Sequence, residues 1–294
     1  MAFGLLFITQ VVSGQVSPVN FNYPYNHLDW KTVESDHFLV HFQTGNQESA
    51  LAISAIAEEI YNPVISLYDY APSEKTSIVL KDRVDISNGA AYFFDNKIDI
   101  WLPSLDTPFR GTHSWYSNVI MHEFIHIVQL GASMNRNNKI PAVYLQWLSY
   151  EDIRRPDVLY GFPKGIVTLP LSTVRIPAWF AEGTAQFNRQ HLHYDYWDTH
   201  RDMILRSNVL ADNLPGLVEM GHFSSKNSIE REMAYNHGFA LTKYMANRFG
   251  EQSIADITRE LQNTNDIRTA MRRSTGVEGE QIYEDWADSL RTAY

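Results

Sequence analysis

One stretch of the chain, SNVIMHEFIHIVQLG from Ser117 to Gly131, constrains the fold more than any other. Its apolar residues predict a helix over 114–130, and they cover almost the whole circumference of that helix. A helix of this kind must be buried among other elements. It nevertheless carries three ionisable groups, His122, Glu123 and His126, and burying them costs free energy unless something pairs them.

The spacing of these groups favours a metal site. His122 and His126 are four residues apart on one helix face, so both imidazoles can reach the same ion. Glu123 is offset by about 100° and can hold a water rather than the metal. The other interpretation is a pair of hydrogen-bonded core histidines. H-E-x-x-H arises by chance in roughly one sequence in fifty of this length, so the motif alone does not decide.

A catalytic metal needs a third protein ligand. The extended motif H-E-x-x-H-x-x-G-x-x-H would need Gly at 129 and His at 132, but the chain has Gln129 and Ala132. The stretch PAWFAEGTAQF offers Glu182 instead, between bulky apolar and small neighbours that permit close helix packing. We therefore predict His122, His126 and Glu182 as ligands of one Zn²⁺ per chain.

The order of patterns along the chain predicts an α+β fold. β-rich segments come early, at 37–42, 76–82 and as a hairpin over 88–104, whereas the chain after Pro177 is mostly helical. We expect a small N-terminal mixed sheet packed on the H-E-x-x-H helix, followed by a mainly helical lobe. Residues 132–176 have the least regular pattern, and Gly131 is expected just after the end of the helix. The predicted divisions are a signal peptide (1–14), an N-terminal α/β lobe (15–135) and a helical C-terminal lobe (136–294).

Composition excludes some classes of protein. The 294 residues carry a net charge of −10 without a cluster of Lys or Arg, which argues against nucleic-acid binding. With no cysteine, a metal must be held by His, Asp or Glu. The apolar residues 2–12 are too short to span a bilayer, and a small-residue pattern follows them. They favour a secretory signal over a buried first strand, so we expect an exported protein without stable membrane insertion.

The segments HEFIH and WFAEGTA together resemble the gluzincin metallopeptidases, the peptidase MA-like group. The resemblance covers roughly residues 36–294. It implies hydrolysis of a peptide or protein substrate by a zinc-bound water that Glu123 activates. The stretch NGAAYFFDNKIDIWLP is similar to the family's substrate-binding edge strand. Tyr235 matches a Y-x-x-G helix that supplies a second catalytic group, and His237 is nearby. Such domains often precede a β-propeller in exported bacterial proteins, periplasmic or extracellular, so a propeller outside this chain is a possible partner.

Two departures from the family pattern refine these expectations. Some gluzincins place an Asp four residues after the ligand Glu to orient the first His, but this chain has Gln186. Residues 88–91 lack the Glu with which aminopeptidases bind a substrate amine, which favours an endopeptidase.

Two alternative functions stay open, and one further segment is interpreted below them. One is a non-catalytic zincin-like binding module of a larger exported protein. Another is a hydrolase of non-peptide amides. The run HLHYDYWDTH (His191–His200) is interpreted as a solvated aromatic surface or cleft wall rather than a second metal site.

Overall fold

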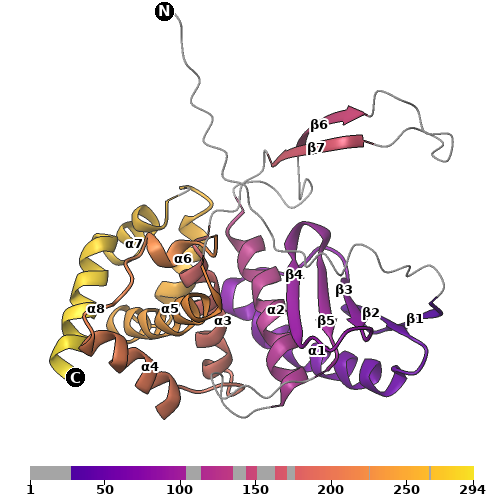
Figure 1. Ribbon diagram of the computed structural model, residues 1–294, viewed down its shortest axis with the longest axis horizontal. Helices are drawn as coiled ribbons and strands as arrows, with labels where there is room; N and C mark the ends of the chain where they lie inside the picture. The colour runs from indigo at the N-terminus through magenta and orange to yellow at the C-terminus, as the bar shows by residue number, and fades with distance from the viewer. Residues whose placement is uncertain are drawn as a thin grey trace, which may run out of the picture.

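The computed structural model describes residues 28–103, 114–134, 176–224, 226–264 and 266–294, together with the backbone of 144–150 and 163–170. The fold is α+β, as predicted: a five-stranded mixed sheet near the N-terminus is followed by a mainly helical region (Figure 1). The expected signal peptide at 1–14 and the expected lobe boundary after residue 135 lie outside the described residues.

The sheet has the strand order β1-β2-β3-β5-β4. Its three inner strands are parallel to one another, and both edge strands are antiparallel to their neighbours. Side chains alternate between the two faces, as in β2, where Phe38, Val40 and Phe42 are buried and the residues between them are partly exposed. The strands are β1 (Trp30–Glu34), β2 (Phe38–Gln43), β3 (Thr76–Lys81), β4 (Asn88–Tyr92) and β5 (Lys97–Trp101).

Two helices, α1 (Gln47–Tyr68) and α2 (Trp115–Ala132), share one core cluster with the buried face of the sheet. Pro63 does not split α1, which runs unbroken for 22 residues. Among the described helices, α1 alone is long and apolar enough to cross a membrane by length and composition. Its residues Ile53, Ala57 and Ile60 are fully buried in this core, as expected for the core helix of a globular fold.

The C-terminal helices surround a second core cluster that includes Trp179, Phe239 and Trp286. Helix α5 ends at Phe249, just before Gly250, and it begins at Ser228, where Asn227 and Glu230 form a capping box. The elements are α3 (Ala178–His191), α4 (Thr199–Leu210), η5 (Glu219–Gly221), α5 (Ser228–Phe249), α6 (Gln252–Glu260), α7 (Ile267–Thr275) and α8 (Gly279–Ala293).

One local expectation, for Gly131, was wrong, and the irregular pattern of 132–176 did not reveal a strand pair. The stretch 132–176 contains an antiparallel strand pair, β6 (Tyr144–Tyr150) and β7 (Pro163–Pro170). Gly131 lies inside α2 rather than after it. The ring of Tyr70 occupies the space that a Cβ at 131 would need, so the glycine serves a packing contact there.

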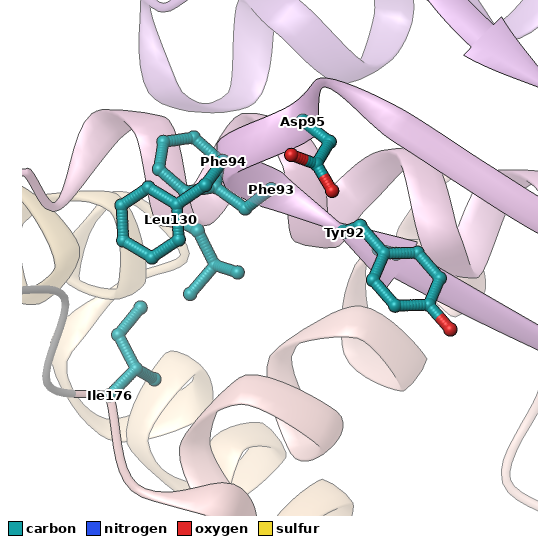
Figure 2. A pocket seen from close by; sticks show the side chains of 7 residues that line it. Tyr92, Phe93, Phe94, Asp95, Leu130 and Ile176 are labelled. Atoms are coloured by element: carbon teal, nitrogen blue, oxygen red, sulfur yellow. The ribbon is translucent and has the colours of Figure 1, made fainter. Parts of the chain in front are cut away.

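The edge strand β4 passes over α2 and leads through η3 (Phe93–Asp95) into β5. Because β4 is the last strand of the sheet, one of its edges has no strand partner among the described residues. A hollow of about 430 Å³ lies beside the end of this strand (Figure 2). Together with α2, the edge strand frames the site described next.

Candidate metal centre

Helix α2 brings two histidines together at its centre. His122 and His126 are only 6% and 9% exposed, and their ring centroids are 4.6 Å apart. Their Nε2 atoms lie 3.0 Å from each other. The i, i+4 spacing on a buried helix therefore makes both imidazoles converge, as the sequence predicts.

Glu182 reaches the same point from α3. Its Oε2 atom lies 2.9 Å from Nε2 of His122 and 3.2 Å from Nε2 of His126. The three ligand atoms all lie within 4.8 Å of one another. A tetrahedral ion with bonds of about 2.0–2.1 Å places its ligand atoms about 3.3 Å apart. The observed spacing is close to this value, so the cluster could hold a metal ion.

Burial and mutual contact set the charges of the three groups. Burial lowers the pKa of His122 to about 3, despite its hydrogen bond with Glu182. Burial also acts to lower the pKa of His126, but the carboxylate of Glu182 outweighs it and the pKa is raised. Burial acts to raise the pKa of Glu182, yet the two histidines hold it well below its usual range. These shifts favour an ionised Glu182 and a neutral His122, whereas the raised pKa of His126 favours its protonated form, which competes with metal binding.

A close crossing of α3 and α5 positions Tyr235 beside this cluster. Gly183 and Gly238 face each other there, and a Cβ on either would collide with the backbone of the opposite helix. One turn before Gly238, the Tyr235 ring lies 6.3 Å from the His122 ring, centroid to centroid. The alternative group, His237, is fully buried, and its Nδ1 lies 2.8 Å from the carbonyl of Met233. The geometry thus favours Tyr235 as the neighbour of the cluster.

Glu123 lies directly under the edge strand. A Cβ at Gly89 of β4 would lie 2.7 Å from Oε1 of Glu123 and 2.5 Å from Cγ2 of Val119. Only glycine lets the strand approach α2 so closely. Glu123 is 7% exposed, so its carboxylate lies beside the strand rather than in bulk solvent, and its charge contributes to raising the pKa of His126.

Among the described residues, the buried polar atoms without a hydrogen-bond partner include one on the first histidine and one on α3. One is Nδ1 of His122, and the other is Oε1 of Gln186. Gln186 is one helical turn after Glu182 on the same face of α3. When Nε2 of His122 binds a metal, Nδ1 carries the proton and becomes a donor. The amide oxygen of Gln186 is thus the candidate acceptor that would orient this ring.

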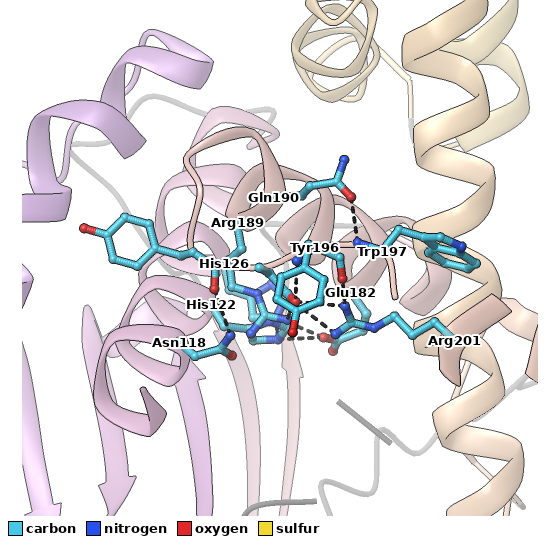
Figure 3. A network of polar contacts seen from close by, with 11 residues as sticks. Asn118, His122, His126, Glu182, Arg189, Gln190, Tyr196, Trp197 and Arg201 are labelled. Carbon is cyan, nitrogen blue, oxygen red and sulfur yellow. Dashed lines mark hydrogen bonds and ion pairs between the residues drawn. The ribbon is translucent and has the colours of Figure 1, made fainter. Parts of the chain in front are cut away.

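A buried ion-pair network lies beside the centre (Figure 3). Asp195 accepts from Nη1 of Arg201 at 2.8 Å and lies 2.8 Å from Nη2 of Arg189. All three side chains are at most 2% exposed. The charge of Arg189 contributes to lowering the pKa of His122. The network ties α3 to α4 and supports the helix that carries Glu182.

Sequence reasoning missed parts of this arrangement. The run 191–200 was interpreted as a solvated surface or cleft wall, but Asp195 within it is buried because both arginines pair with it. The role of Gly89 was also missed. Its only signal in the sequence is a glycine inside a β-rich segment, which often marks close backbone approach.

Comparison of the chain with models of protein families gives no match, and comparison with curated proteins gives none. The resemblance of the two motifs to gluzincins therefore stays a prediction. What the chain can do is argued below from the residues around His122.

Proposed function

We propose that this protein is a zinc-dependent metallopeptidase of the gluzincin type that cleaves within peptide chains. One observation carries the proposal: His122, His126 and Glu182 converge at ligand distances, with Glu123 on the same helix under a strand edge that no other described strand pairs with. A structural cluster of core residues has no need for a further acid next to it.

The donor set fits zinc. Two imidazole nitrogens and one carboxylate oxygen match the ligands of catalytic zinc sites, which keep a fourth position open. Zinc bound there acts as a Lewis acid and lowers the pKa of water towards about 7. The neutral His122 and ionised Glu182 are the protonation states that such binding requires.

Glu123 is the proposed general base and acid. Its carboxylate would take a proton from the attacking water and then deliver it to the nitrogen of the leaving amine. Burial between β4 and α2 keeps this carboxylate from rotating freely and excludes competing water. The Gly89 contact thus supports a fixed position for the proton-transfer group.

Tyr235 is the proposed donor to the developing oxyanion. Its ring lies beside His122, and stacking against Phe223 at 5.5 Å between centroids holds it there. A hydroxyl aimed at the carbonyl oxygen is worth most in the transition state, when that oxygen gains charge.

The outer edge of β4, which has no strand partner in the part of the chain that the structure describes, would bind the substrate backbone. An extended peptide can add to such an edge through main-chain hydrogen bonds. The segment Asn88–Ala91 has no acidic side chain that would fix a substrate's terminal amine, which supports action within chains rather than at their ends.

The test compares wild type with Glu123→Gln for zinc content and for cleavage of a diverse peptide library. We expect about one zinc per chain in both, and cleavage only by wild type. Glu48→Gln makes the same chemical change at an exposed position and should cleave normally. Zinc binding without cleavage by wild type would favour a non-catalytic binding module. Cleavage of amides other than peptides would point to the other hydrolase class.

A further inference from the structure

The hollow beside β4 has mainly apolar walls (Figure 2). Leu130 and Ile176 point toward one another across it, and Phe93 and Phe94 lie beside Leu130. The two phenylalanine rings pack edge to face, with centroids 5.1 Å apart. Polar groups are at the rim, where Asp95 and Tyr92 are exposed. An apolar side chain of a bound molecule would fit these walls.

The hollow and the proposed active site lie along the same side of α2. Leu130 is seven residues after Glu123, so both face the same side of the helix, about 10.5 Å apart along its axis. Strand β4 follows the same side, because Gly89 lies over Glu123 and Ala91 lines the hollow. Alternation places the side chains of residues 89 and 91 on one face of the strand.

These spacings fix which substrate residue reaches the hollow. An extended peptide advances about 3.3 Å per residue, so about three residues span the distance from Glu123 to Leu130. Antiparallel pairing is the more stable per residue, and β4 runs from the Glu123 end towards the Leu130 end. A peptide that is antiparallel to β4 therefore reaches the hollow with residues that precede the bond at Glu123.

We propose that the hollow is a specificity pocket for a large apolar side chain, aromatic or leucine, on the third residue before the cleaved bond. The proposal rests on the proposed peptidase function and names the substrate class of that site. Burying such a side chain stabilises binding, whereas the rim carboxylate of Asp95 repels an acidic residue.

The first measurement is kcat/KM for five peptides that differ only at this third position, which carries Phe, Leu, Ala, Lys or Asp. The parent peptide is a library member cleaved by wild type and not by Glu123→Gln. We expect Phe and Leu to exceed Ala by about tenfold or more, and Asp to be the poorest. Equal rates for all five peptides would overturn the pocket while leaving the peptidase standing. Absence of any cleavage dependent on Glu123 would overturn both.

The second measurement changes the pocket itself. Leu130→Glu should lower kcat/KM for the Phe peptide about tenfold and make the Lys peptide the better substrate. Leu210→Glu is the matched control, because Leu210, like Leu130, lies in the last turn of a helix but is 67% exposed and is not among the pocket residues. Phe94→Glu repeats the test outside a long helix if Leu130→Glu does not fold. An unchanged preference in a folded pocket variant would overturn the proposal.

Discussion

Replacing Gly89 by alanine tests how closely β4 must approach α2. Gly89 is not among the glycines with positive φ, so alanine meets no backbone strain there. The added methyl meets side chains instead. It would lie 2.5 Å from Cγ2 of Val119 and 2.8 Å from Cγ of Glu123. Carbon atoms pack best at about 3.5–4.0 Å, so strand or helix must retreat by about 1 Å.

That shift has two measurable consequences. Overpacking of this kind costs about 1–3 kcal/mol of unfolding free energy. Because a 1 Å displacement of a catalytic group costs about 100-fold in rate, kcat/KM should fall by about this factor. Zinc content should stay near one per chain, since the three atoms nearest the new methyl belong to Val119 and Glu123 rather than to His122, His126 or Glu182.

The assay measures kcat/KM, zinc content and thermal unfolding of Gly89→Ala and of the control Gly216→Ala. Gly216 also lacks a positive φ, and a Cβ there meets nothing within 4 Å. The control should match wild type in all three measurements. Wild-type kcat/KM in Gly89→Ala would refute the claim that this contact fixes Glu123.

Three further changes test groups around the centre. Asp195→Asn should cost about 3–5 kcal/mol in denaturant unfolding at pH 7, because it removes the carboxylate that pairs with two buried guanidinium groups. Burial acts to raise the pKa of Asp195, but Arg189 and Arg201 lower it. The stability that ionised Asp195 contributes is therefore fully present above the usual carboxyl pKa, and it is lost as the pH falls through the lowered pKa of the folded protein. Asp195→Asn should not show this loss. If the variant lost stability in acid as much as wild type does, this reasoning would be contradicted. Gln186→Leu should weaken zinc affinity about 10–100-fold in a chelator titration, and unchanged affinity would exclude it as the group that orients His122. Tyr235→Phe should lower kcat about 10²–10³-fold with zinc retained, whereas an unaltered kcat would remove its proposed role.

The sequence predicts the ligand cluster well because the information is local. His122 and His126 are one turn apart, and the apolar pattern around them requires a buried helix. Glu182 could be predicted as the third member of the cluster because its neighbours are small and bulky apolar residues. An acidic side chain in such a segment is expected at a contact between two helices. The α+β order of elements follows in the same way from periodicity along the chain.

Contacts between distant segments are what the sequence pattern does not reveal. Asp195 is in a run rich in His, Tyr and Trp, and only its pairing with Arg189 and Arg201 explains its burial. Gly131 matched a helix-ending glycine, but its absent side chain makes room for Tyr70, which follows the end of α1. Such roles depend on which elements pack together, and no local rule specifies that.

Some missed features did carry a local signal. The capping box formed by Asn227 and Glu230 has the spacing of a helix start, and it marks the beginning of α5 before Tyr235. The strand β7 begins and ends with proline, at Pro163 and Pro170, so its pattern looks irregular at both ends. Proline at the end of a strand is compatible with β-sheet pairing. The two prolines therefore made the segment look irregular without preventing it from forming a strand.

Anomalous diffraction at the zinc absorption edge, from crystals of the zinc-saturated protein, tests the central claim most directly. The account predicts one strong peak about 2.0–2.1 Å from both Nε2 atoms of His122 and His126, and about 2.0–2.2 Å from the Glu182 carboxylate. A zinc peak bound elsewhere, or none between these three residues, would contradict it.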